Sequence, residues 1–240
     1  MNKYQSLLLL FFINLSLAQN NSHNNVWTRF SITNEIHTKF KLEIEAQKRW
    51  QNNVTLQNSN NFFQEELMKS VRFWTHYKFN SKLNFSISPF AYFQHTAIIT
   101  AESDMLKKKS YEIRYTAAAD FKEKVLAKTY FIDRLALEYR DFKNNNNDNV
   151  IRLRNKIAFK HEFNKKWSLM AFDELFLNLN SSDKKHLFDH NRIGITGSFI
   201  PSEKIKIDFG YIRIERLPKN NLESMSENNF LIMIYYTFKN

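Results

Sequence analysis

The chain has 240 residues, of which 43% are apolar and 25% are charged, so its composition excludes an intrinsically disordered protein. Cysteine is absent, which excludes disulfide bonds, thiolate metal sites, cysteine nucleophiles and a lipidated N-terminal cysteine. The formal net charge of +11 fits anionic lipid or lipopolysaccharide as a partner. Nucleic acid is not expected as a partner, because the start of the chain is typical of exported proteins.

Residues 1–18 have the three parts of a secretory signal peptide. Lys3 gives a positive start, and the apolar stretch over residues 7–17 is too short to span a bilayer as a helix. Small residues then lead to a cleavage site after Ala18. A short buried helix at the start of a soluble domain is the alternative. The pattern favours a signal peptide over residues 1–18 and a barrel domain over residues 19–240.

From about residue 26 onward, apolar residues recur at every second position, which is the pattern of strands with one apolar and one polar face. Ile151, Leu153 and Ile157, for example, fall on one face of a predicted strand. Arg152 and Arg154 fall on the opposite face. Eleven segments of this kind cover residues 25–36, 39–50, 62–79, 82–97, 110–123, 125–141, 149–163, 166–180, 188–200, 203–216 and 228–239. They are longer than the roughly 9–11 residues that cross a bilayer.

The connections between the predicted strands alternate between short and long. Short turns are expected near His37-Thr38, Asn80-Ser81, Glu123-Lys124, Asn164-Lys165 and Pro201-Ser202. Longer polar loops are expected near residues 51–61, 98–109, 142–148, 181–187 and 217–227. Short periplasmic turns and long outer loops are typical of bacterial outer-membrane barrels. The predicted fold class is therefore all-β: a single transmembrane, antiparallel, up-and-down β-barrel.

The number of strands does not follow directly from the number of segments. Bacterial single-chain barrels normally have an even number of strands, and eleven conflicts with that rule. We therefore expect 10–12 strands, with twelve preferred. The last predicted strand carries Tyr236 and Phe238 near its end. A terminal aromatic strand is similar to the signal that the barrel-assembly machinery recognises, so this machinery is an expected partner during biogenesis.

If the apolar face meets lipid, the charged face lines the interior of the barrel. The predicted lumen charge network consists of Arg72, Glu112, Arg114, Arg134, Glu138, Arg140, Arg152, Arg154, Lys156, Glu174 and Arg192. One interpretation is a plug, in which these charges pair across strands and fill a narrow interior. The other is a porin-like pore with an ion-selective lining. The plug is preferred, because side chains largely fill barrels of this size.

No catalytic, cofactor or metal site is predicted, and enzymatic activity is not expected. The chain has neither a G-x-S-x-G nor an H-E-x-x-H motif. Ser70 and His76 lie on one predicted strand about 20 Å apart, so they cannot touch each other. His190 begins a strand beside an outer loop, where a stacking or hydrogen-bonding role at the rim is a simpler interpretation than catalysis.

Several short segments, in order along the chain, carry a family resemblance. They are Trp27, Tyr111–Tyr115, Asp133–Arg140, Arg152–Arg154, Asp173–Phe176, Asn191–Gly194 and Gly210–Arg213. With these segments the chain resembles an uncharacterised family of exported β-barrel proteins from Bacteroidetes, known only as a domain of unknown function (DUF). The resemblance extends over nearly all of the chain after the signal peptide. It implies an outer-membrane barrel and implies no activity.

The sequence thus predicts a barrel in the outer membrane of a Gram-negative bacterium, either structural or forming a narrow pore with a charged lumen. Two alternatives stay open. The first is an outer-membrane enzyme that modifies lipids, which rests only on Ser and His residues lying on barrel strands. The second is a soluble periplasmic, lipocalin-like barrel that binds an apolar ligand, which requires the apolar face to turn inward.

Overall fold

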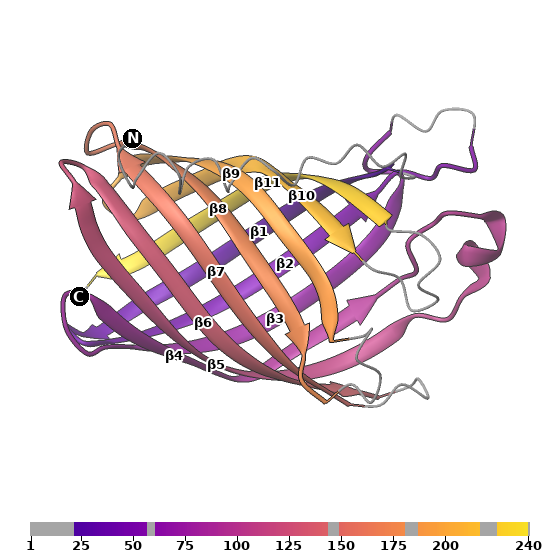
Figure 1. Ribbon diagram of the computed structural model, residues 1–240, viewed down its shortest axis with the longest axis horizontal. Coiled ribbons are helices and arrows are strands. Elements are labelled where there is room, and N and C mark those ends of the chain that lie inside the picture. Colours follow the sequence, from indigo (N-terminus) through magenta and orange to yellow (C-terminus); the bar gives the residue numbers. More distant parts are fainter. Residues whose placement is uncertain (1–21, 57–60, 144–148, 181–186, 217–224, 240) are drawn as a thin grey trace, which may run out of the picture.

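The computed structural model describes residues 22–56, 61–143, 149–180, 187–216 and 225–239. Within these residues the chain forms one closed barrel of eleven strands (Figure 1). The strands are β1 (Ser22–His37), β2 (Phe40–Gln51), β3 (Glu65–Lys78), β4 (Leu83–His95), β5 (Ser110–Leu126), β6 (Thr129–Phe142), β7 (Val150–Glu162), β8 (Trp167–Asn178), β9 (Phe188–Ser202), β10 (Ile205–Arg216) and β11 (Met225–Lys239). The predicted signal peptide lies outside the described residues.

A short 3-10 helix, η1 (Glu102–Leu106), lies in the loop between β4 and β5. Across the described ranges, no helix is long and apolar enough to cross a membrane. The long predicted strands and the all-β class are confirmed. The period-two pattern succeeded because nearly every strand alternates between the two faces of a closed wall.

The closure of the barrel corrects the preference for twelve strands. Consecutive strands pair antiparallel, but β1 and β11 meet in parallel, with Trp27 opposite Leu231. The described residues therefore form a barrel with an odd number of strands, eleven. An odd number forces one parallel pair at the seam, and a parallel ladder satisfies the backbone donors and acceptors as an antiparallel one does.

Two predicted turns are displaced along the chain. The turn expected at Glu123-Lys124 lies later, because both residues still pair with β6 and β5 continues to Leu126. Lys128, which follows, has a positive φ of 69°. The turn expected at Pro201-Ser202 is likewise later, because β9 continues through Ser202. The first turn contains no glycine, and at the second the turn-forming residues Pro201 and Ser202 still belong to β9.

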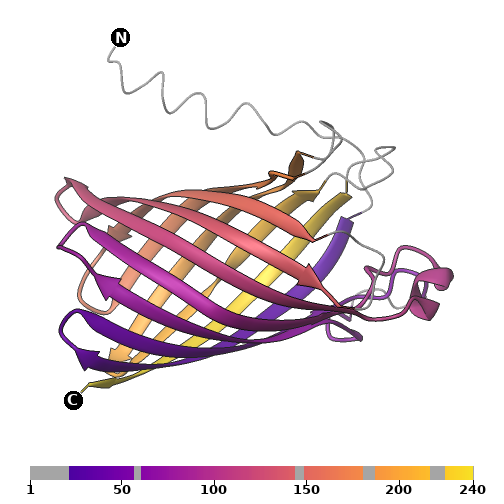
Figure 2. The same ribbon diagram turned by 90° about the horizontal axis from the view of Figure 1, so that it is seen from below.

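The two ends of the barrel differ. All short turns lie at the end where β11 finishes, and the longer connections lie at the opposite end with η1 (Figure 2). We call these the turn end and the loop end. The predicted alternation of short and long connections is confirmed for the described residues. β1 starts at the loop end, which follows directly from its parallel pairing with β11.

The outer wall of the barrel is apolar. Large exposed apolar side chains occur on every strand, such as Phe30, Ile44, Leu135, Ile195 and Ile232. Pairs of outward aromatic rings lie toward each end of this wall. Toward the turn end the pairs are Phe40–Tyr77, Phe131–Phe159, Trp167–Phe199 and Tyr236–Phe238, and toward the loop end they are Trp50–Phe63, Tyr92–Tyr111, Tyr115–Tyr139 and Tyr211–Phe230.

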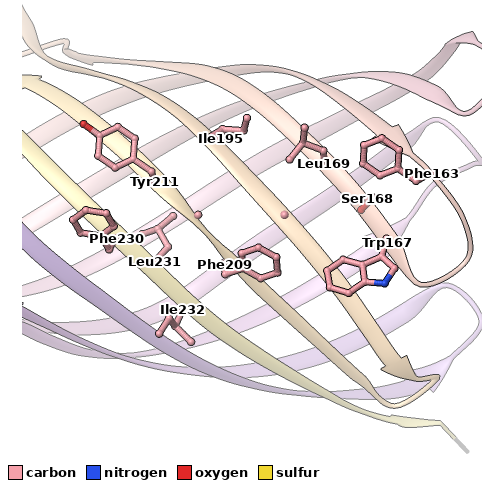
Figure 3. A pocket seen from close by; sticks show the side chains of 12 residues that line it. Phe163, Trp167, Ser168, Leu169, Ile195, Phe209, Tyr211, Phe230, Leu231 and Ile232 are labelled. Atoms are coloured by element: carbon pink, nitrogen blue, oxygen red, sulfur yellow. The ribbon is translucent and has the colours of Figure 1, made fainter.

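A hollow of about 610 Å³ marks the outer wall over β8 to β11 (Figure 3). Gly197 and Gly210 line it, beside the rings of Trp167, Phe209 and Phe230. A Cβ atom at Gly197 would lie 2.9 Å from the Phe209 ring, so a side chain there would displace that ring. Because its lining is almost entirely apolar, the hollow continues the apolar outer wall.

Candidate functional site, the charged interior of the barrel

Because side chains alternate between the two faces of each strand, the charged side chains point into the barrel interior. All of the predicted lumen residues lie on inward positions, and each of the three acids has arginine partners. The predicted residues lie on β3 (Arg72), β5 (Glu112, Arg114), β6 (Arg134, Glu138, Arg140), β7 (Arg152, Arg154, Lys156), β8 (Glu174) and β9 (Arg192). Neighbouring strands bring them together through the barrel register, which the sequence does not reveal.

Glu138 is the centre of the network. Its carboxylate lies 2.5 Å from Nη2 of Arg152, 2.6 Å from Nη1 of Arg154 and 3.7 Å from Nη1 of Arg114. The side chain of Glu138 has 0% of its surface exposed. A carboxylate needs this charge and hydrogen-bond compensation to remain ionised when it is buried.

Two further carboxylates extend the network on either side of Glu138. Glu112 lies 2.7 Å from Nε of Arg114 and 2.8 Å from Nη2 of Arg140. Glu174 lies 2.6 Å from Nη2 of Arg154, which therefore bridges two acids. Each acid thus shares its arginines with a neighbour, so the interior is a connected network instead of a set of isolated pairs.

Three predicted members are held differently. Arg134 pairs with Asp120 on the neighbouring strand, with Nη1 2.8 Å from the carboxylate. The Arg72 guanidinium lies over the rings of Trp74 and Phe93, with Cζ 4.9 and 5.2 Å from the ring centroids. Nζ of Lys156 lies 3.9 Å from the centre of the Phe172 ring. Aromatic faces therefore stabilise part of the positive charge in the interior.

Sequence reasoning missed the part of the network beside the seam. Asp189 lies 3.0 Å from Nη1 of Arg152, and Arg216 lies between Asp189 and Glu227. Nδ2 of Asn25 donates to Glu227 at 3.1 Å and so carries the network across the seam to β1. Glu227 and Arg216 share the inward period of their strands and could have been found. Asp189 could not, because a register shift between β8 and β9 turns it inward out of phase.

Buried side chains point into the barrel interior from all around its wall. In the described structure every strand contributes at least one inward side chain that is buried. One such residue from each strand, from β1 to β11, is Asn25, Gln51, Arg72, Phe93, Glu112, Glu138, Arg152, Phe176, His190, Ile214 and Asn229. An apolar cluster around Trp27, Phe172 and Leu231 packs inside the same wall. We call this set of buried side chains the sealed layer, because the plug preferred from the sequence requires that it leave no continuous path for water.

The comparison with known proteins gives a family and no activity. A family model described as protein of unknown function (DUF2490) matches residues 24–221. The chain belongs to the DUF2490 family. No curated protein matches the chain. The expected membership in a family of unknown function is thus confirmed.

At the loop end of this DUF2490 protein, the β4–β5 connection is fastened to β1 and β2. His23 Nε2 lies 2.6 Å from the carbonyl oxygen of Ile99, and Gln51 bonds the backbone of Ala97 and of Ile99. Asp104 then holds the following turn. Burial alone would raise the pKa of the Asp104 carboxyl, but hydrogen bonds from Lys107 and from the backbone and hydroxyl of the preceding turn hold that pKa well below its usual value.

At the turn end of the DUF2490 barrel, the interior is open to solvent. The side chains of His76 and Arg134 each keep 27% of their surface exposed, although both point inward. Lys206, nearer the mouth, keeps 41%. The interior therefore has a vestibule at the turn end, and the sealed layer lies nearer the loop end.

A hydroxyl, an imidazole and a carboxylate meet at the wall of this vestibule, where Ser86 itself is buried. His76 Nδ1 lies 2.8 Å from Oγ of Ser86, and its Nε2 lies 3.3 Å from Oε2 of Glu43. The register sets this contact, because His76 and Ser86 are direct cross-strand neighbours on β3 and β4. The structure agrees with the prediction that Ser70 is not the partner of His76. The hydroxyl partner was missed, because strand register cannot be read from one strand alone.

His190 is the other histidine that the sequence singled out. Its ring stacks on Phe176 with centroids 4.0 Å apart, and its Nδ1 lies 3.0 Å from Asp189. His190 lies near the start of β9, as expected, and its side chain makes the expected stacking and polar contacts while being almost fully buried. In the described part of the chain, no three His, Asp or Glu side chains are arranged to hold a metal ion.

Proposed function

We propose that this DUF2490 protein is an outer-membrane β-barrel of a Gram-negative bacterium with a plugged interior, a structural protein that does not conduct. The single observation that carries the proposal is the combination of an apolar outer wall with a charged, sealed interior. An apolar outer wall can contact lipid, whereas charged side chains are kept away from lipid inside the barrel. The lipocalin-like alternative needs the opposite arrangement, with apolar residues inside.

The spacing of the aromatic pairs supports a membrane location. Outward Phe40 and Trp50 lie ten residues apart on β2, one in each set of aromatic pairs. At about 3.3 Å per residue and a strand tilt of about 40°, this spacing corresponds to roughly 25 Å along the barrel axis. Outer-membrane barrels have an apolar band of about that height between two aromatic girdles. Lipid and lipopolysaccharide are then its natural partners.

Cysteine labelling tests the location and the orientation together. The natural chain has no cysteine, so every label comes from an introduced residue. We expect Leu106→Cys, in the exposed loop-end connection, to react with an impermeant maleimide on whole cells. We expect Lys165→Cys, in the β7–β8 turn, to react only after the outer membrane is permeabilised.

Leu135→Cys on the outer wall serves as the third position. Its exposed side chain faces lipid in this proposal, so it should stay unlabelled in membranes and react after solubilisation in denaturant. Ready labelling of all three positions in a detergent-free soluble fraction would contradict the proposal. Labelling of Lys165→Cys on intact cells would reverse the orientation.

A second candidate function is ester hydrolysis in the vestibule, and the contact of Ser86, His76 and Glu43 is the observation that favours it. We infer that His76 accepts the Ser86 proton as Oγ attacks an ester carbonyl carbon. The same proton then passes to the leaving alcohol as the C–O bond breaks. Water hydrolyses the acyl-serine, which releases the acid and restores Ser86. Glu43 orients the imidazole of His76.

A fluorophosphonate probe tests this second candidate on the folded protein in detergent. We expect the probe to label Ser86, with labelling abolished in Ser86→Ala and slowed at least about 100-fold in His76→Asn. Ser70→Ala and Thr129→Ala are matched controls. Ser70 lies on the same strand as His76, and Thr129 forms another hydroxyl–histidine pair, with His161 at 2.9 Å. No labelling of Ser86, or equal labelling in His76→Asn with the fold intact, would exclude hydrolysis.

A further inference from the structure

A polar strip crosses the outer wall between β6 and β9. Its members are Asp133, Asn155, Asp173 and Asn191, one from each strand and all on outward positions. Nδ2 of Asn155 donates to Asp133 at 2.7 Å, and Nδ2 of Asn191 donates to Asp173 at 2.5 Å. The strip thus alternates between carboxylates, which accept hydrogen bonds, and amides, which can donate them.

Apolar side chains surround this polar strip. Leu135 follows Asp133 on the outward face of β6, and Ile157, Leu175 and Ile193 take the corresponding positions on β7, β8 and β9. Asp173 lies about six residues from the aromatic Trp167, in the interior of the apolar band. In lipid these carboxylates and amides would lack water, and an unsatisfied polar group there costs several kcal/mol. The wall around the strip is therefore poorly suited to direct contact with lipid.

We propose that the polar strip is the contact surface for a second copy of this chain. A two-fold axis along the membrane normal, between Asn155 and Asp173, reverses the order of the strip in the partner. Beside the axis each carboxylate then faces an amide: Asp173 faces Asn155 of the second copy, and Asn155 faces Asp173. An isologous interface requires this kind of self-complementarity. The exposed Leu135, Ile157, Leu175 and Ile193 complete the contact.

A second copy of this chain is proposed as the partner because carboxylates and amides alternate along the strip. A strip of like groups would need a partner of the opposite kind, whereas an alternating strip complements itself when its order is reversed. The inference rests on the proposed membrane location, because only in lipid are these polar groups costly to expose. It predicts an apolar interface with a polar centre, in which the hydrogen bonds fix the register of the two barrels.

Disulfide cross-linking in native membranes tests the dimer. Leu175→Cys lies beside the two-fold axis, and we expect oxidation to give a cross-linked dimer as the main product. Ile44→Cys, equally on the outer wall but on the distant β2, is the matched control and should stay monomeric. Cross-linking of both at the same yield, or of neither, would overturn the proposal. A cross-link from Leu175→Cys to a different protein would also overturn it.

A charge swap makes the test specific to the strip. In the Leu175→Cys background, Asn155→Asp places two carboxylates face to face across the axis, and we expect the dimer yield to fall about tenfold or more. Adding Asp173→Asn restores an amide opposite each carboxylate and should restore the yield. Failure of the double variant to recover would contradict the proposed pairing. Heat-modifiable migration of each variant shows insertion separately, so loss of the dimer is distinguishable from failure of the membrane proposal.

Discussion

Glu138→Gln should lower the free energy of unfolding by about 3–5 kcal/mol, the usual cost of breaking a buried ion pair. The carboxylate of Glu138 is fully buried and forms ion pairs with Arg114, Arg152 and Arg154 at the same time. A neutral amide keeps the volume but leaves the guanidinium groups with too little negative charge in a water-free interior. Urea unfolding of the protein in lipid vesicles, followed by tryptophan fluorescence, measures the change.

Glu123→Gln is the matched control for this prediction. Glu123 also pairs with a cation, Lys82, but its side chain is 36% exposed near the turn end. Exposed pairs contribute about 0–1 kcal/mol, so this variant should unfold almost as the natural protein does. If Glu138→Gln and Glu123→Gln cost the same, the network does not hold the barrel closed as described.

The strands were predictable from sequence, because each one lies between two chemically different environments. On β7 the alternation of Ile151, Leu153 and Ile157 with Arg152 and Arg154 reports both environments residue by residue. The predicted lumen residues were found by the same logic, since facing inward depends only on position along one strand. The alternation carries no information about which arginine reaches which carboxylate.

The seam, the bulge and the vestibule contacts depend on pairing between strands. The parallel contact of β1 with β11 joins the two ends of the chain, so no local pattern predicts it. Asp189 turns inward through a register shift and breaks the period that would have identified it. Ser86 reaches His76 only because β3 and β4 align those two positions. Long-range register, set by the closure of the whole barrel, decided each of these features.

The polar strip shows that exceptions to the alternation are also informative. Asp133 and Asp173 occupy positions where the pattern calls for apolar residues, yet both are hydrogen-bonded to asparagines on the next strand. A carboxylate that breaks the apolar face is costly unless something covers it. The strip therefore points to a covered surface, which the proposed dimer would provide.

The proposed closure of the interior leads to a second prediction with a large expected effect, which concerns ion conduction. The charges line the barrel as they do in a pore, but Glu112 and Glu138 have no exposed surface and every described strand adds a buried side chain. Replacing Trp27 and Phe176 together by alanine removes two buried rings from the sealed layer. We expect this double variant to conduct in planar bilayers, because Arg49 and Arg192 lose the rings they stack on and water can enter.

Single-channel recording of the natural protein in planar lipid bilayers tests the plugged barrel most directly. The protein should insert, as shown by its heat-modifiable migration after recovery from the bilayer lipid, and should give no stable unitary current steps at moderate voltage. Reproducible steps of one size from the natural protein would contradict the sealed interior. They would assign the charged network to the lining of an open pore.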